Sequence, residues 1–191
     1  MNYQILYDYY EKELQKTLSY KRFEHSLNVV ETAFKISEFF SIEKDRVALA
    51  ALVHDRGKEI SNKRLLSIAK EQNLIYDESE EIYPELLHGP IGAYLLEYDN
   101  KIRDEKILNS VRYHTTGRPN MSQLEIIIFL ADLVEPNRSY PRVDDLRKLV
   151  FNEPYEALLK SLDWTLEYLM RTGKVIHPLT VKTRNHYLNK V

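Results

Sequence analysis

The chain has 191 residues, of which 43% are hydrophobic and 29% are charged, and its formal net charge is -2. This length suits one compact domain with its own core, and the small net charge argues against nucleic acid binding by a large basic field. There is no cysteine, which excludes disulfides, thiolate metal sites and a cysteine nucleophile. Any metal must therefore be held by imidazole and carboxylate groups, which suit iron, manganese, zinc, cobalt or nickel.

Apolar residues recur at helical spacing along almost the whole chain, and glycine is scarce, with 5 residues. Glycine and proline fall between the periodic segments, for example at Gly57, Gly89-Pro90 and Gly117. We expect helices at about 2–18, 21–40, 44–55, 61–72, 90–99, 103–115, 121–135, 154–172 and 178–190. The predicted fold class is all-α, a single domain over 1–191 with a core at about 18–135 and C-terminal helices at 154–190 packing on it.

The N-terminal segment is charged and lacks a continuous apolar core, so it does not read as a signal peptide. No apolar run approaches the roughly 20 residues that a membrane span needs. We therefore expect a cytoplasmic protein with no membrane partner. The 14 tyrosines and an amphipathic first helix leave room for a homodimer interface.

The predicted helix 21–40 carries His25 beside apolar residues such as Leu27 and Val29. Arg22 stands three positions earlier, and its side chain would project near the same pocket as His25. A lone histidine on an apolar face is more often a core residue than a metal ligand. An arginine is likewise most often a solvated surface charge.

The predicted helix 44–55 ends on the pair His54-Asp55, after a run of small apolar residues. Neighbouring helical side chains point about 100° apart, so both reach one ion only near the end of the helix. Gly57 is expected to end the helix there and open a pocket, and Lys58 would project nearby. Asp55 has two oxygens and could bridge two ions, although a lone His-Asp pair also occurs by chance in many proteins.

Two more histidines lie at the predicted helix boundaries. His88 heads the turn HGPIGA, where a helix N-terminus would face an anion. His114 continues the apolar stripe of Ile107, Leu108 and Val111, so its side chain is expected to point inward. Each histidine alone indicates little.

Asp132 lies inside the apolar run 126–134, which we expect to form a largely buried helix that Ser122 and Glu125 begin with a capping box. An ionised carboxylate in that place costs several kcal/mol unless a cation or strong donors meet it. A metal ion would meet that need. The alternative is an aspartate at the helix edge, paired with Arg138.

The tail offers His177, Thr180 and Arg184 beside a helix that starts at a proline, which an ordinary capped helix explains equally well. The histidines and aspartates placed at apolar helix faces and helix ends are better explained together than as separate accidents. We therefore expect a metal site built from His25, His54, Asp55, His88, His114 and Asp132.

The order His25, His54-Asp55 and Asp132 resembles the metal-dependent phosphohydrolases of the HD superfamily. Three segments narrow the likeness: HGPIGA at 88–93, HTTGRPNMSQLEIIIFLADLVEPNR at 114–138 and IHPLTVKTRN at 176–185. They are similar to the YqeK family, the bacterial symmetrical bis(5'-nucleosyl)-tetraphosphatases. The likeness covers most of the chain, and the pattern HTxGRPxM…LADxxEPxR is its most specific part.

The resemblance implies a metal-dependent phosphohydrolase that uses one or two iron ions, with manganese, cobalt or zinc as alternatives. It implies that a metal-activated water cleaves a phosphoanhydride of diadenosine tetraphosphate symmetrically, giving two ADP. The primary metal ligands it implies are His25, His54, Asp55 and Asp132, while His88 and His114 would complete a second metal position or contact the phosphates. The catalytic residues would be Asp55, His88, His114 and Lys58. The substrate contacts would be Arg22, His25, Lys58, His88, His114, Thr115, Asp132, Arg138, Ile176, His177, Pro178 and Thr180.

Two positions depart from the family pattern. Arg56-Gly57 follows the His-Asp pair where the family usually has an apolar residue and alanine, and His186 stands where an aromatic residue is common. The first change could loosen the helix end or add a phosphate contact, and neither removes a ligand. Two other functions stay open: an HD phosphohydrolase acting on another nucleotide, and a catalytically weak nucleotide-binding regulatory protein.

Overall fold

The structure is a computed structural model that describes residues 2–99 and 101–190, and all regular secondary structure in this part of the chain is helical. The predicted all-α fold is confirmed. Nine α-helices match the predicted ones to within three residues at each end: α1 Tyr3–Thr17, α2 Tyr20–Ser37, α3 Lys44–Val53, α4 Asn62–Glu71, α6 His88–Tyr98, α7 Glu105–Arg112, α8 Gln123–Val134, α10 Pro154–Arg171 and α11 Pro178–Tyr187.

Three short elements escaped the sequence analysis: α5 Ser79–Ile82, the 3-10 helix η1 Pro84–Leu87, and α9 Val143–Val150. With four residues each, α5 and η1 are too short to display a repeating apolar pattern. The expectation that Gly89-Pro90 separates two segments is wrong, because α6 begins at His88 and contains both residues. Proline is tolerated in a first helical turn because the N–H it lacks has no partner there.

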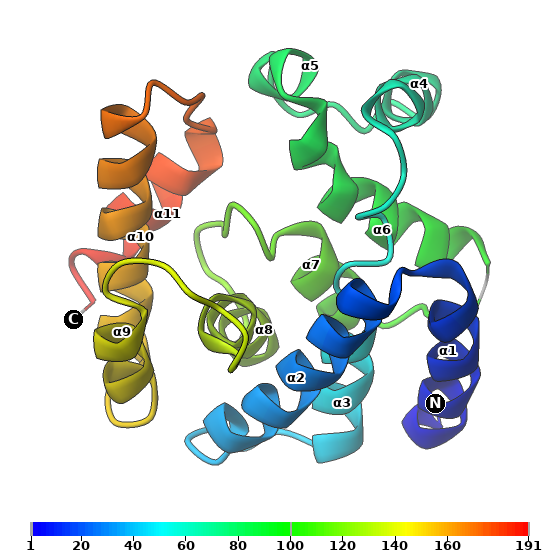
Figure 1. Ribbon diagram of the computed structural model, residues 1–191, viewed down its shortest axis with the longest axis horizontal. Helices are drawn as coiled ribbons and strands as arrows, with labels where there is room; N and C mark the ends of the chain where they lie inside the picture. The colour runs from blue at the N-terminus through cyan, green and yellow to red at the C-terminus, as the bar shows by residue number, and fades with distance from the viewer. Residues whose placement is uncertain (1, 100, 191) are drawn as a thin grey trace.

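The helix α8 is the centre of the fold and contacts α2, α3, α7, α9 and α10 (Figure 1). Its residues 126–131 are all buried, as expected for a helix that is apolar on every side. The predicted capping box is confirmed, because the Ser122 side chain accepts a hydrogen bond from the Glu125 N–H and the Glu125 carboxylate accepts one from the Ser122 N–H. Other helices pack their apolar faces around this central helix.

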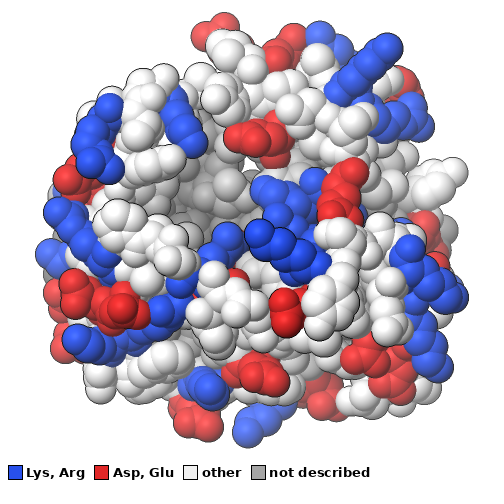
Figure 2. Space-filling model, viewed as in Figure 1, with Lys and Arg blue, Asp and Glu red and all other residues white. Residues whose placement is uncertain are grey.

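The C-terminal helices α9, α10 and α11 form the other side of the molecule from α4, α5 and α6 (Figure 1). A second, smaller core of Leu65, Ala69, Leu87 and Ile91 joins α4, η1 and α6. Figure 2 shows a hollow on this face between the two sides, with Lys and Arg side chains gathered along one of its edges. No helix in residues 2–99 and 101–190 is long and apolar enough to cross a membrane.

Arg147 of α9 holds the chain that leaves α8. Its guanidinium donates to the backbone carbonyls of Val134, Glu135 and Arg138 at 3.0, 2.9 and 2.7 Å. The last carbonyls of a helix have no backbone N–H partner within that helix, so Arg147 supplies the donors that they lack. We expect Arg147→Ala to lower the free energy of unfolding by about 1–3 kcal/mol, because it removes donors from buried acceptors.

Urea denaturation measures this loss, and Lys148→Ala is the matched control. The Lys148 side chain is 79% exposed and next to Arg147 on the same helix. If both variants unfold at the same urea concentration, Arg147 does not stabilise the end of α8.

Candidate metal centre

Five segments meet where α2, α3, α7 and α8 pack together and the start of α6 joins them. Each segment brings one or two of the predicted ligands: His25 from α2, His54-Asp55 directly after α3, His88 as the first residue of α6, His114 just after α7, and Asp132 near the end of α8. The four histidines and Asp55 are buried, and the Asp132 side chain is 15% exposed. The six residues that the sequence analysis named are thus brought together, and five of them are buried.

The ligand atoms of these residues form three overlapping groups, and within each group the atoms lie within 4.8 Å of one another. The groups are His25, His54 and Asp55; His54, His114 and Asp132; and Asp55, His88 and His114. Because neighbouring groups share residues, we describe the six residues as one metal-binding cluster. Imidazole and carboxylate are ligands that divalent transition metals accept.

Asp55 lies between the two halves of the cluster. Its Oδ2 is 3.6 Å from His54 Nε2 and 3.7 Å from His25 Nε2. Its Oδ1 is 3.5 Å from the Nε2 atoms of both His88 and His114. One carboxylate therefore turns one oxygen toward each half, which is the arrangement that bridging two cations requires.

Each histidine ring is oriented by its δ nitrogen. Nδ1 of His54 lies 2.7 Å from the Ala51 carbonyl, and Nδ1 of His114 lies 2.8 Å from the Val111 carbonyl. Nδ1 of His88 contacts the Glu85 carbonyl in the same way. A carbonyl only accepts hydrogen bonds, so each Nδ1 must carry the proton and donate it. In the neutral rings, the ε nitrogens then present lone pairs to the cluster.

The ε nitrogens face carboxylates and one another, and the Thr115 hydroxyl lies 3.3 Å from that of His88. Nε2 of His25 and of His54 are buried without a hydrogen bond, although both face carboxylates. Nε2 of His88 and of His114 lie 2.9 Å apart, so two lone pairs face each other when both rings are neutral. A cation placed among these atoms turns the repulsion into attraction. The residues present therefore fit a divalent metal ion.

The charge states of Asp55, Asp132 and His88 agree with this donor set. Burial lowers the pKa of His54, but Asp55 and Asp132 outweigh it and raise that pKa. Burial raises the pKa of Asp55, but His54, His114 and His88 outweigh it and hold that pKa well below its ordinary value. Burial likewise raises the pKa of Asp132, which His25, His54 and Arg138 hold well below the usual range. Burial, with His114 and Lys58, lowers the pKa of His88 to about 3. Both carboxylates are thus ionised, and His88 is neutral, at neutral pH.

Four further predicted residues surround the cluster. Arg22 Nη1 donates to Asp55 Oδ2 at 2.7 Å, and the Arg138 guanidinium pairs with the Asp132 carboxylate. The pairing of Asp132 with Arg138 that we raised as an alternative is therefore present together with its histidine contacts. The Thr115 hydroxyl lies 3.3 Å from His88 Nε2, and Lys58 acts on His88 through its charge.

The predicted residues of the tail lie elsewhere. The His177 side chain accepts a hydrogen bond from the Leu179 N–H at 3.1 Å, which caps α11, and its Nε2 lies 3.3 Å from the buried Glu80 carboxylate. In the described part of the chain, no hydrogen bond or ion pair links Ile176, His177, Pro178 or Thr180 to the cluster, and their contact with a substrate stays a prediction. In this structure, His177 both caps α11 and joins it to Glu80 of α5.

The sequence analysis missed Glu135, which is 2% exposed and supports His25. Its Oε1 lies 3.1 Å from His25 Nδ1, and its Oε2 accepts a hydrogen bond from the Asn137 N–H at 2.7 Å. A carboxylate behind a ligating histidine fixes the ring and its tautomer. The spacing was a usable signal, because Glu135 comes three residues after Asp132 and so lies on the same side of the helix end.

Gly57 has a different role from the one we expected. The helix α3 already ends at Val53, and Gly57 lies in the turns that follow. A Cβ at Gly57 would lie only 2.3 Å from the backbone oxygen of His88. The absent side chain therefore lets the start of α6, with His88, approach the His54-Asp55 turn closely.

Comparison with known proteins agrees with this geometry. Residues 22–137 match the HD domain, a stretch that includes all six residues of the cluster. The chain belongs to the HD-domain family. Within this family, it is similar to proteins named bis(5'-nucleosyl)-tetraphosphatase, symmetrical, so the family resemblance noted in the sequence is confirmed.

Two such HD-domain relatives illustrate the likeness. The protein from Bacillus subtilis is 35% identical over 90% of this chain and 92% of its own length. The one from Halalkalibacterium halodurans is 37% identical over 90% of this chain and 91% of its own length. A crystal structure from Clostridium acetobutylicum, described as a predicted HD superfamily hydrolase involved in NAD metabolism, superposes with a TM-score of 0.92 at 34% identity. The superposition covers 97% of this chain and 98% of the chain in the crystal structure.

Proposed function

We propose that this protein is a metal-dependent phosphohydrolase that cleaves diadenosine tetraphosphate at its central phosphoanhydride and releases two ADP. The observation that carries the proposal is the cluster itself, in which four histidines present ε nitrogens to two ionised aspartates. The names of the similar HD-domain proteins supply the substrate and the position of cleavage.

The metal ligands in this proposal are His25, His54, Asp55 and Asp132, with His88 and His114 on the far side of Asp55. When bound, a divalent metal supplies Lewis acidity toward phosphoryl oxygens and lowers the pKa of a coordinated water. The contribution of the chain is to hold the ligands before the metal arrives. The δ nitrogens fix the rings against backbone carbonyls and Glu135, so few side chains need to reorganise.

Cationic side chains beside the cluster suit a polyphosphate. Arg22 and Arg138 each hold one aspartate of the cluster, and Arg138 is part of the loop that follows α8. Guanidinium groups bind phosphate oxygens with two parallel hydrogen bonds and neutralise charge that develops during phosphoryl transfer. Lys58 and Thr115, on the His88 side, would bind phosphates at the other end of the tetraphosphate. ADP is a stable anion, so its departure needs no strong general acid.

Three parts of the proposal remain predictions. Iron is the metal that the family resemblance favours, and the donor set also accepts manganese, cobalt or zinc. The cytoplasmic location and the homodimer also remain predictions. NAD is a second candidate substrate, because the similar crystal structure is described as that of a hydrolase involved in NAD metabolism.

A substrate panel separates these candidates. Purified protein with its metal content measured is incubated with diadenosine tetraphosphate, NAD, ATP and a simple phosphate monoester. We expect the tetraphosphate to have the highest kcat/KM by at least about tenfold, because only it places phosphates on both sides of Asp55. A higher kcat/KM for NAD would show that NAD, and not diadenosine tetraphosphate, is the preferred substrate.

A further inference from the structure

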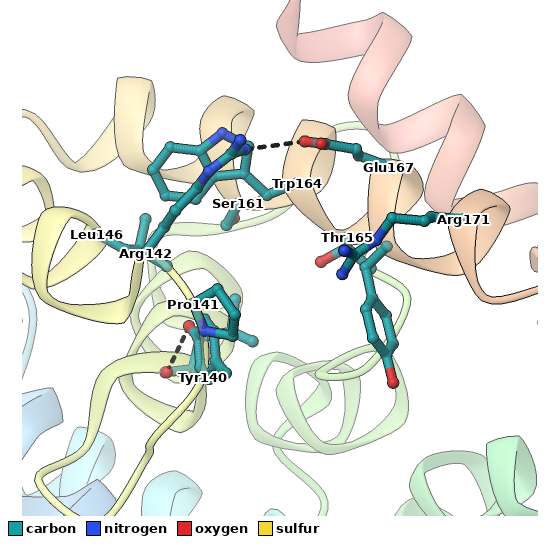
Figure 3. A pocket seen from close by; sticks show the side chains of 11 residues that line it. Tyr140, Pro141, Arg142, Leu146, Ser161, Trp164, Thr165, Glu167 and Arg171 are labelled. Atoms are coloured by element: carbon teal, nitrogen blue, oxygen red, sulfur yellow. Dashed lines mark hydrogen bonds and ion pairs between the residues drawn. The ribbon is translucent and has the colours of Figure 1, made fainter.

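Two arginines pair with the aspartates of the cluster, and they come from different parts of the chain. Arg138 belongs to the loop after α8, which also lines a pocket of about 430 Å³ with Trp164 and other residues of α9 and α10 (Figure 3). In that loop, the Tyr140 hydroxyl donates to the Leu133 carbonyl at 2.8 Å, so the segment that carries Arg138 is fastened to α8. Arg22 lies in the first turn of α2, and its position depends on how that turn is held.

The start of α2 lacks the local cap that the start of α8 has. Each helix follows a serine at its N-cap position, Ser19 for α2 and Ser122 for α8. In α8, Glu125 comes three residues after Ser122 and completes a capping box. In α2, Arg22 stands at the equivalent position, and the Ser19 side chain makes no cap hydrogen bond to its own helix. The arginine that pairs with Asp55 thus takes the place of the local carboxylate.

A carboxylate from a distant segment replaces the missing one. The Ser19 N–H donates to Glu59 Oε2 at 2.6 Å, and the Ser19 hydroxyl donates to Glu59 Oε1 at 2.5 Å. Glu59 lies four residues after Asp55, in turns where the Lys58 N–H donates to the Asp55 carbonyl at 2.9 Å. One short segment therefore holds the start of α2 at two points, through Asp55 on Arg22 and through Glu59 on Ser19.

We propose that Glu59 is a positioning residue for the reaction, because it fastens the first turn of α2 to the turns after α3 and so sets how Arg22 meets Asp55. The inference rests on the proposed function, in which Arg22 neutralises phosphoryl charge beside the cluster. A carboxylate that accepts two hydrogen bonds from one residue fixes both the place and the direction of the helix start, and its negative charge suits a helix N-terminus.

Arg22 depends on this support because its own contact is open to water. Its Nη1 donates to Asp55 Oδ2 at 2.7 Å, and its side chain is 29% exposed. A long side chain with access to water has many conformations, and a pairing of this kind does little by itself to order a helix start. A displacement of about 1 Å in a group that orients a reacting phosphate can lower the rate by up to about 100-fold.

Replacing Glu59 with alanine is expected to lower kcat for diadenosine tetraphosphate by about tenfold, because Arg22 is no longer held in place. The bound metal per chain should stay at the parent value, because Glu135 holds the His25 ring separately. Glu59→Gln should keep kcat within about twofold of the parent, because its amide oxygen accepts the Ser19 N–H and its amide nitrogen donates to the Ser19 hydroxyl.

Glu71 is the matched control. It is exposed, as Glu59 is, and its carboxylate accepts the Ser67 hydroxyl proton at 2.7 Å, but both residues belong to α4 and lie outside the cluster. Glu71→Ala should leave kcat and metal content unchanged. Urea denaturation of all variants shows whether Glu59→Ala and Glu71→Ala differ in stability.

A double variant tests whether Glu59 acts through Arg22. Arg22→Ala is expected to lose activity itself, since it removes the guanidinium. Adding Glu59→Ala to Arg22→Ala should then lower kcat no further, because nothing is left for Glu59 to position. A residue that only stabilises the fold would cause the same loss of kcat in both backgrounds.

Inorganic pyrophosphate gives a readout that needs no turnover. Metal-loaded protein is titrated with pyrophosphate in a calorimeter, and the Kd is compared among the variants. We expect the Kd to rise by at least about threefold in Glu59→Ala, because the charge-assisted bonds from Arg22 are weakened. Glu59→Gln and Glu71→Ala should bind pyrophosphate as the parent does.

Parent values of kcat and Kd in Glu59→Ala, equal losses in Glu59→Ala and Glu59→Gln, or an additive loss in the Arg22→Ala background would each overturn the positioning role. Failure of the proposed function has a different signature. If the parent does not cleave the tetraphosphate, the pyrophosphate constants still decide whether Glu59 positions Arg22. If the parent cleaves it and Glu59→Ala is unimpaired, only the role of Glu59 is removed.

Discussion

Replacing Asp55 with asparagine is expected to lower kcat by on the order of a thousandfold, as loss of a principal electrostatic group does in other enzymes. Asp55 is 3% exposed, and its two oxygens face different halves of the cluster. Asparagine keeps the volume but removes the negative charge and turns one ligand atom into a donor. The bound metal, measured per chain, should fall together with kcat, since both depend on the same two oxygens.

Asp104→Asn is the control for this variant. Asp104 is also an ion-paired aspartate, which Arg46 and Tyr3 contact, and it lies outside the cluster. Its pKa, like that of Asp55, is lowered, because bonds from Arg46 and Tyr3 outweigh burial. Asp104→Asn should lose stability but keep its metal content and kcat. Full turnover and normal metal content in Asp55→Asn would show that the cluster is not the reaction centre.

Glu135→Ala is expected to weaken metal binding by about 10- to 100-fold, the usual effect of removing the group behind a ligating histidine. Without the Glu135 carboxylate, Nδ1 of His25 has no acceptor, and the ring is free to place its proton on Nε2. A protonated Nε2 cannot ligate a metal. Titration of the metal-free protein with a divalent metal, against a competing chelator of known affinity, measures the change.

Glu135→Gln distinguishes positioning from a general loss of structure. A glutamine oxygen still accepts from His25 Nδ1, so this variant should recover most of the metal affinity that alanine loses. The unfolding free energy of each metal-free protein is measured alongside. If the two variants lose affinity equally, or if affinity follows stability alone, then Glu135 does not act through His25.

The sequence was sufficient for the long helices and for the composition of the cluster. Apolar periodicity marked α2 and α7, and a continuous apolar run marked α8. The cost of a carboxylate in that apolar helix singled out Asp132 before any geometry was known. The uncommon placement of histidines at helix ends then gave the other members. These signals are local, and each can be read within a few residues of the chain.

Signals that depend on tertiary contacts were out of reach. The close approach of His88 to Gly57 involves residues that are far apart in sequence, and a glycine there reads equally well as a helix stop. The pairing of His177 with Glu80 likewise joins residues that are 97 positions apart. The pocket beside Trp164 likewise arises only when α9 and α10 pack against the loop after α8.

The most direct test of the proposed reaction is the product pattern in isotopically labelled water. Metal-loaded protein is incubated with diadenosine tetraphosphate in water enriched in oxygen-18. The nucleotides are then separated, and their masses are measured by mass spectrometry. Symmetrical cleavage predicts ADP as the only product, with label on one of the two ADP molecules from each substrate and no turnover after chelation. ATP and AMP as products, or ADP formation that survives removal of the metal, would contradict the reaction assigned to this cluster.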